Sequence, residues 1–266
     1  MIRLVVSDPA DPRLDDFRDL TVADRRPDRP GGRGAVIAEG VVVVRRLLGS
    51  PYRIRAVLGV AARINDLLPD LSTVDVSAYV VTPQVMSEVV GFHLNRGVLA
   101  VADRGSPPQV EELLAGDRLL ILEGINDHEN LGALFRNAAA LGVDAVLLGH
   151  RCADPLYRRS VRVSMGHVLR LPFATLPRWP DDLRAVRAAG HSVLALTPRT
   201  GAVPLPEVDP TRHPRAALLV GAEGPGLSEG ALAAADVQVQ IPMAAGVDSL
   251  NVAIAAAIAC YHLGSR

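Results

Sequence analysis

The sequence contains no lysine, so all 28 of its basic residues are arginine. This absence excludes the phosphate-binding lysine of P-loop proteins, the ATP-binding lysine of kinases, and Schiff-base chemistry with pyridoxal phosphate or aldol substrates. Cysteine is nearly absent as well, with only Cys152 and Cys260. Two cysteines at this distance exclude an iron–sulfur cluster, a four-cysteine zinc site and a CxxC redox motif. A disulfide framework is equally excluded, which favours a reducing compartment.

Long hydrophobic runs are also missing. The longest, Val252 to Tyr261, has ten residues, whereas a membrane-spanning helix needs about 20. Met1 to Val6 is too short for the apolar core of a signal peptide. These features predict a cytoplasmic protein with no membrane partner.

Aromatic residues make up only 3% of the chain, and the net charge of −1 is spread evenly along it. A nucleic-acid partner would therefore be held by local arginine patches, because no general positive field exists. The strongest patch lies within residues 151–170, where five arginines face one acid. Asp154-Pro155 favours the start of a short helix there, which would put Arg158 and Arg162 on one face, next to Arg159. An ordinary solvent-exposed helix face is the alternative interpretation.

Turn-forming residues near 103–118 divide the chain. Before them, strand-like segments alternate with helical ones, which predicts a small α/β domain over residues 1–110. After them the alternation becomes regular, and it predicts an α/β domain over residues 117–266 with a parallel sheet covered on both faces. The strands predicted in this second domain are 119–122, 145–148, 193–196, 217–220 and 237–241.

Ligands of open parallel sheets bind beyond the carboxyl ends of the strands, and four segments of the second domain follow predicted strands. The first contains Asn130 and Arg136 in a stretch with the apolar spacing of a core-facing helix. The second is Thr197-Pro198, which is also ordinary strand-to-loop punctuation.

The third segment, Gly221 to Ser228, places Glu223 among glycines, including Gly224. Glycines let a backbone approach a ligand closely. The spacing matches neither GxGxxG nor a Walker motif, which argues against dinucleotides and nucleoside triphosphates. A glycine-rich turn without a ligand is the alternative.

The fourth segment runs from Ile241 through Leu250 to Asn251. Ser249 is the predicted N-cap of the helix that follows, while Asn251, just inside that helix, is unfavourable there by propensity. The helix is apolar nearly all round, so we expect it to be buried in the core or against a second subunit.

Three of these segments, in this order, resemble the motifs of the SpoU (TrmH-type) branch of the SPOUT RNA methyltransferases. The resemblance covers about residues 117–264, and Arg162 to Pro172 also resembles the family. Ala38-Glu39-Gly40 leads into a helix as in the small ribosomal-protein-like RNA-binding domain that precedes the catalytic domain in many members. The matching motifs are Asn130…Gly132…Arg136-Asn137, Gly221-Ala-Glu223-Gly224-Pro-Gly226-Leu-Ser228 and Ile241-Pro-Met243…Ser249-Leu250-Asn251-Val252.

The resemblance implies a parallel sheet whose C-terminal segment threads a deep trefoil knot, and a homodimer packed through the knotted region. It implies 2′-O-methylation of a ribose in RNA, with S-adenosyl-L-methionine (AdoMet) as methyl donor. By family position, the donor would be held by Gly221, Ile241 and Leu250, with Thr197 and Gly224 nearby. The polar reaction centre would comprise Asn130, Arg136, Glu223, Ser249 and Asn251.

A guanidinium group stays protonated up to a pH of roughly 12. We therefore expect Arg136 to stabilise the developing ribose alkoxide and a neighbouring phosphate, in preference to acting as a base. No metal is expected, because the seven histidines form no HxH or HxxxH pair and the donor is already activated.

The expected partner is structured RNA bound by Arg158, Arg159 and Arg162. The separate N-terminal domain favours ribosomal over transfer RNA. Three alternatives remain open at this stage: a transfer-RNA ribose methyltransferase, a non-catalytic RNA-binding member of the same fold, and an unrelated small-molecule enzyme on a doubly wound sheet.

Overall fold

The computed structural model describes residues 1–20 and 34–264, and the chain divides into two compact units. The first unit comprises Met1–Ser106 and Asp154–Arg170, and the second comprises Pro107–Ala153 and Leu171–Arg266. The division at Ser106 lies within the predicted boundary region. The segment Asp154–Arg170 was predicted to belong to the second domain, but it folds with the first unit.

The first unit is built on a five-stranded mixed sheet in which β5 runs antiparallel to both of its neighbours. The sheet order is β1 (Ile2–Val5), β4 (Ser77–Val80), β3 (Ile54–Gly59), β5 (Val98–Asp103) and β2 (Ala35–Glu39). The short helices of this unit are η1 (Pro12–Phe17), α1 (Val41–Leu48), α2 (Ala61–Asp66), α3 (Leu68–Leu71) and α4 (Pro83–Val90). Helix α4 begins where Thr82 accepts a hydrogen bond from the Val85 amide, the pairing expected of an N-cap threonine. Its apolar face joins η1 and β5 in one core, with Phe17, Met86 and Leu99 at the centre.

Ion pairs attach the segment Asp154–Arg170 to the first unit. The buried Asp154 carboxylate accepts hydrogen bonds from both terminal nitrogens of Arg104, at 2.5 and 2.7 Å. Helix α7 (Arg158–Val163) packs beside β2, and η3 (His167–Leu169) packs beside α1. The Arg46 guanidinium also donates to the Met165 carbonyl. These contacts explain why the segment leaves the domain to which its sequence position assigned it.

The helix start predicted at Asp154-Pro155 is wrong. Helix α7 begins at Arg158, with Tyr157 in the N-cap position and no side-chain cap. Asp154 accepts from the Leu156 amide in a local turn, and its carboxylate is otherwise committed to Arg104. An ion pair with a residue 50 positions away has replaced the local capping role.

The second unit is built on a seven-stranded sheet in which every pairing is parallel, as predicted. Its order is β10 (Val203–Pro204), β12 (Val237–Gln240), β9 (Ser192–Leu196), β11 (Ala216–Gly221), β6 (Arg118–Glu123), β7 (Ala145–Leu148) and β8 (Phe173–Thr175). The chain runs outward from β6 to β8, then crosses to β9 and inserts β11 between β9 and β6. The strand order therefore reverses at β6 and β11, and such a switch point is where open α/β sheets bind ligands.

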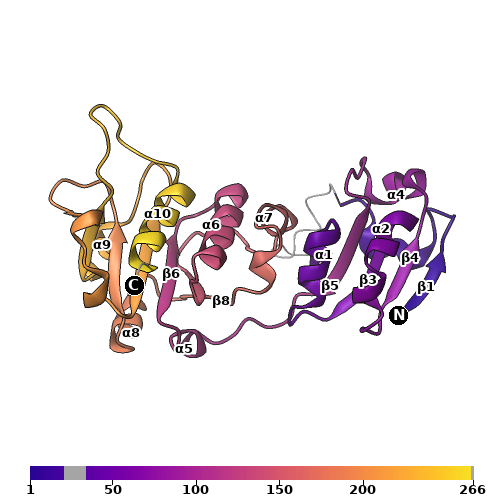
Figure 1. Cartoon of the computed structure of the whole chain (residues 1–266), viewed down its shortest axis with the longest axis horizontal. Helices are drawn as coiled ribbons and strands as arrows, with labels where there is room; N and C mark the ends of the chain where they lie inside the picture. The colour runs from indigo at the N-terminus through magenta and orange to yellow at the C-terminus, as the bar shows by residue number, and fades with distance from the viewer. Residues whose placement is uncertain (21–33, 265–266) are drawn as a thin grey trace. The chain divides into compact units, whose positions relative to one another are not determined.

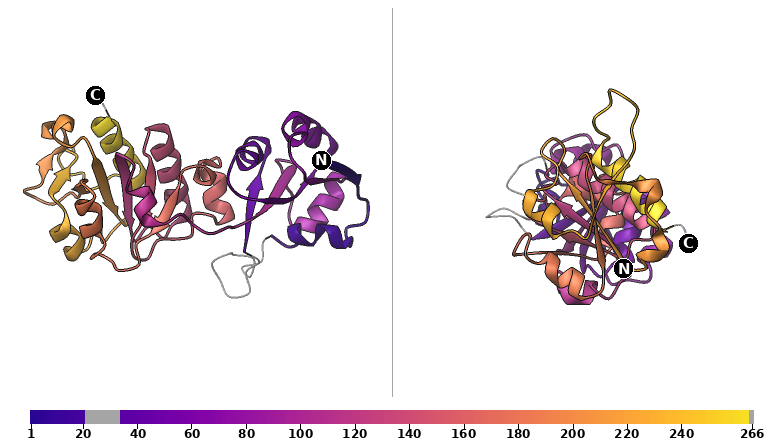
Figure 2. Two further views of the ribbon diagram at one scale, coloured as in Figure 1. Left: turned by 90° about the horizontal axis from the view of Figure 1, so that it is seen from below. Right: turned by 90° about the vertical axis from the view of Figure 1, so that its left-hand side faces the viewer.

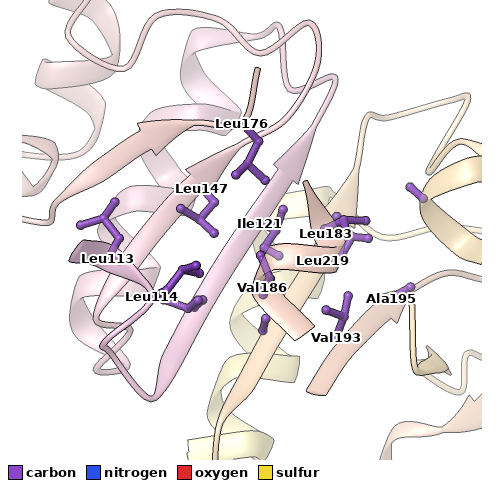
Figure 3. Packing of buried hydrophobic residues seen from close by; sticks show 14 of the residues in the cluster. Leu113, Leu114, Ile121, Leu147, Leu176, Leu183, Val186, Val193, Ala195 and Leu219 are labelled. Carbon is purple, nitrogen blue, oxygen red and sulfur yellow. The ribbon is translucent and has the colours of Figure 1, made fainter. Parts of the chain in front are cut away.

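Helices cover both faces of this sheet. On one face, α5 (Val110–Leu113), α8 (Leu183–Ala188) and α9 (Glu229–Ala234) pack against the strands, with Leu183 and Val186 beside Ile121 and Leu219 (Figure 3). On the other, α6 (His128–Ala140) and α10 (Val252–Gly264) lie side by side (Figures 1 and 2). Within residues 1–20 and 34–264, no helix combines the length and apolarity needed to cross a bilayer.

Candidate active site

The candidate site lies at the carboxyl ends of four adjacent strands of the second unit. Glu123 ends β6, Gly221 ends β11, Thr197 follows β9 and Ile241 follows β12. The loop 241–251 then leads to α10 (Figure 1). Because neighbouring parallel strands end at the same edge, segments more than 100 residues apart in sequence meet here.

Three of the predicted reaction-centre residues share one hydrogen-bond network. The Asn251 Nδ2 amide donates to Asn130 Oδ1 at 2.8 Å and to Glu223 Oε1 at 2.9 Å. These residues come from the start of α10, the first turn of α6 and the glycine-rich turn after β11. The structure thus joins three motifs through a single amide group.

Asn251 also caps α10. Its Oδ1 accepts hydrogen bonds from the amides of Ala253 and Ile254, at 3.0 and 3.3 Å, and the helix begins at Val252. The prediction that Ser249 caps this helix is wrong, because Ser249 lies two residues further out, with its hydroxyl 3.3 Å from the Asp248 carboxylate. The poor helix propensity of asparagine is no conflict here, since an N-cap is a position that asparagine favours.

Hydrogen bonds hold helix α6 at its start and again two turns further along. Asp127 Oδ1 accepts from the amides of Glu129 and Asn130, at 2.9 and 2.8 Å, which caps the helix and holds Asn130 at its start. Two turns later, Asn137 Nδ2 donates to the Ala253 carbonyl of α10 at 3.0 Å. No site role was predicted for Asn137, although its spacing of seven from Asn130 puts both on one helix face.

Arg136 is exposed on α6. No hydrogen bond or ion pair joins it to Asn130, Glu223 or Asn251 in the described part of the chain. Its guanidinium is therefore available to a bound molecule.

The glycine-rich turn has a backbone shape that only glycine allows at its start. A Cβ on Gly221 would lie 2.4 Å from the carbonyl carbon of Gly226, which is closer than two non-bonded atoms can approach. Gly224 and Gly226 have φ angles of +87° and +70°, in the left-handed region that favours glycine. No atom lies within 4 Å of where a Cβ would stand on either, so the turn presents bare backbone.

The other predicted donor-binding residues follow neighbouring strands or precede α10. Thr197 is buried, and its Oγ1 accepts from the Arg199 amide at 3.4 Å. Ile241 is half-buried where the loop leaves β12, and Leu250 is exposed just before α10. No cluster of metal-binding side chains occurs among residues 1–20 and 34–264.

The three predicted RNA-binding arginines have different environments, all within the first unit. Arg158 lies 3.3 Å from the buried Glu39 carboxylate, and its guanidinium sits 4.9 Å from the centre of the Phe92 ring. Burial lowers the pKa of Arg158, and the Glu39 charge opposes that shift. Arg159 and Arg162 are exposed. Arg158 therefore attaches α7 to β2, a role that differs from the predicted contact with RNA.

We predict that Arg158→Ala and Arg162→Ala have opposite profiles. Losing Arg158 leaves Glu39 buried without its nearest cation and should lower the free energy of unfolding by about 2 to 4 kcal/mol. Losing exposed Arg162 should change it by less than about 0.5 kcal/mol, while reducing the salt dependence of RNA binding by about one unit of slope. Thermal unfolding and filter binding at several salt concentrations measure both effects. Equal effects on stability would contradict the distinction.

Comparison with known proteins gives the same result as the motifs. Residues 117–261 match the SpoU rRNA Methylase family. An uncharacterized tRNA/rRNA methyltransferase of Mycobacterium tuberculosis is 55% identical, across 97% of this chain and 90% of its own length. The 23S rRNA (guanosine(2553)-2'-O)-methyltransferase RlmP of Bacillus subtilis is 30% identical, across 85% of this chain and 87% of its own.

A solved structure is also similar over nearly the whole chain. It is the AdoMet-bound rRNA methyltransferase from Sinorhizobium meliloti, with a TM-score of 0.79, 27% identity, and coverage of 98% of this chain and 97% of its own. The parallel sheet, the motif residues meeting at its switch point and these similarities all agree. The chain belongs to the SpoU rRNA methylase family.

Proposed function

We propose that the protein transfers a methyl group from AdoMet to a ribose 2′-hydroxyl of ribosomal RNA in the cytoplasm. The observation that carries this proposal is the Asn130–Asn251–Glu223 network beside a bare glycine turn. Among the relatives, the Bacillus subtilis protein is named a 23S rRNA 2′-O-methyltransferase, which supports both the reaction class and the RNA class.

The strand ends fit AdoMet as the donor. At Gly224 and Gly226 no atom lies within 4 Å of where a Cβ would stand, so no side chain covers the turn there, and Thr197 and Ile241 follow the two strands beyond β11. Backbone groups of these residues and of Leu250 would hold the donor. Bound AdoMet supplies a methyl group already activated by its sulfonium, so we propose that no metal takes part.

The chain's own residues would then prepare the ribose. The Arg136 guanidinium would stabilise negative charge developing on the 2′-oxygen and bind a neighbouring RNA phosphate. Asn130, Asn251 and Glu223 would orient the ribose, with Ser249 contributing from the loop before α10. As the oxygen–methyl bond forms and the methyl–sulfur bond breaks, the 2′-proton would leave to the phosphate or to water.

We further propose that the first unit binds structured RNA. Its segment Asp154–Arg170 carries exposed Arg159 and Arg162, and arginines held on a folded surface suit the recognition of RNA backbone. A separate RNA-binding unit favours ribosomal RNA as the target, with a transfer-RNA ribose as the alternative substrate.

We propose that α10 forms a homodimer interface and that the loop 241–251 is part of a trefoil knot. One face of α10 exposes apolar side chains at helical spacing, with Ile254 55% and Tyr261 70% exposed and Leu250 and Ile258 alongside. Contiguous exposed apolar surface of this kind typically marks an interface. Membership of the SpoU family supports the knotted arrangement, with the loop 241–251 leading from β12 to α10.

Ile254→Glu is expected to convert the dimer into monomers, because it places a charge at the centre of this apolar face. Sedimentation velocity or light scattering measures the change. The matched control is Val203→Glu, at another exposed apolar position of the same unit, which should leave the mass unchanged. A wild-type protein that is monomeric at micromolar concentration would contradict the proposed interface.

Two measurements test the proposed function. Calorimetry should detect AdoMet binding to the full chain, and methyl-labelled AdoMet should transfer label to unmodified ribosomal RNA. Binding without transfer to any RNA, including an assembling ribosomal subunit, would favour a non-catalytic RNA-binding protein. Absence of donor binding would overturn the methyltransferase assignment.

A further inference from the structure

Glu123 has a buried carboxylate next to the candidate site, and neither the prediction nor the proposed function gives it a role. It is the last residue of β6 and is only 8% exposed. Its Oε1 accepts a hydrogen bond from the Trp179 indole Nε1 at 2.5 Å, and its Oε2 accepts one from the Ser228 amide at 2.9 Å. Two short N–H bonds compensate the charge for the water it has lost.

These contacts put one residue at both ends of the glycine-rich turn. In the sheet, Glu123 is the register partner of Gly221, where the turn begins. Through its side chain it holds the Ser228 amide, where the turn ends and α9 begins. Ser228 then caps α9 by accepting from the Ala231 amide at 3.3 Å, so the anchored end is continuous with a helix.

Within the turn itself the Glu223 side chain is also held, because its Oε1 accepts from Asn251 Nδ2 and from the Val252 amide, at 2.9 and 3.4 Å. Gly224 and Gly226 have no side chains, and the internal contact is a single bridge in which the Gly226 amide donates to the Ala222 carbonyl at 3.0 Å. Glycine loses more conformational freedom on ordering than any other residue. The shape of the glycine stretch therefore depends on these anchors, and Glu123 holds both of its ends.

Trp179 in turn fixes the orientation of the carboxylate. The indole ring lies so close to Gly149, at the end of β7, that a Cβ there would stand 2.6 Å from a ring carbon. The packed ring directs its N–H at Oε1 of Glu123. The carboxylate is thereby held between the Trp179 and Ser228 donors.

We propose that Glu123 is a positioning residue for the methyl donor. It pre-forms the glycine turn in the shape that AdoMet binds, and it does so without touching the donor. This inference rests on the proposed function, because it assigns the donor to this turn. Preorganisation of this kind acts on affinity by removing an ordering cost from binding.

Glu123→Gln tests the proposal. A glutamine has the same shape but only one amide oxygen, so its NH₂ group must face either the Trp179 or the Ser228 donor. We expect the dissociation constant for AdoMet, measured by calorimetry on the full chain, to rise about tenfold or more. The KM for AdoMet should rise in parallel, with little change in the KM for RNA.

A matched control and a rescue variant separate positioning from general damage. Glu229→Gln changes an exposed carboxylate on α9 that pairs with exposed Arg199, and this variant should bind AdoMet like the wild type. Adding Trp179→Phe to Glu123→Gln removes the opposing indole donor, so the glutamine oxygen can serve the Ser228 amide and affinity should recover.

Two results would overturn the inference. One is unchanged AdoMet affinity in folded Glu123→Gln. The other is a lower melting temperature with equal losses for donor and RNA, and no recovery in the double variant. Both are distinct from failure of the proposed function, in which the wild type itself would not bind AdoMet.

Discussion

Arg136→Ala is expected to slow methyl transfer by about 10²- to 10³-fold, while AdoMet still binds with its normal affinity. The size follows from removing one fixed positive group that faces charge developing in the transition state. Arg136 is exposed and has no ion-pair partner among the described residues, so its loss should leave the melting temperature unchanged. Single-turnover rates with labelled AdoMet, together with calorimetric donor affinity, measure both parts.

Two further variants define the role of Arg136. Arg136→Lys keeps the charge but loses the planar fork that binds phosphate through two bonds, so we expect an intermediate rate. Arg184→Ala removes an exposed arginine of α8 that pairs with exposed Asp181, and it should retain the full rate. Near-normal turnover in Arg136→Ala would show that the assignment is wrong.

Asn251→Ala should affect both stability and activity. It removes the N-cap of α10, which should lower the free energy of unfolding by about 1 to 2 kcal/mol. It also removes the donor that joins Asn130 to Glu223, so we expect methyl transfer to fall by more than tenfold. Denaturant unfolding and steady-state kinetics measure the two losses.

Asn251→Asp separates these effects. The aspartate keeps an oxygen for the Ala253 and Ile254 amides and remains a good cap, but it places a second carboxylate beside Glu223 where an N–H donor stood. We therefore expect the cap of α10 to be retained and transfer to be still reduced. Full activity in Asn251→Asp would show that the amide donor is not needed.

The sequence predicted the central strands β6, β7, β9 and β11 well because they are largely buried and read as apolar runs. Strands β8 and β10 were missed since they contain only three and two residues, too few for any pattern. The start of α7 was misplaced because Asp154, an apparent N-cap, pairs with Arg104. Local sequence contains no signal for such a distant ion pair.

Some features of the candidate site could likewise be predicted from the sequence, and others could not. The motifs named Asn130, Glu223 and Asn251, and the structure brings these three into contact. Which residue caps α10 depended on geometry, because serine and asparagine are comparable N-caps and only the structure gives the helix start. Arg158 looked like free surface charge, since its partner Glu39 lies 119 residues away. The bonds of Glu123 likewise involve residues 56 and 105 positions distant.

Methylation of a ribose 2′-hydroxyl is tested by finding which atom of the RNA carries the methyl label. The protein is incubated with methyl-labelled AdoMet and, separately, with unmodified ribosomal RNA and transfer RNA, and each RNA is digested to nucleosides. We expect label in a 2′-O-methylnucleoside from the ribosomal RNA. Label on a base would contradict it.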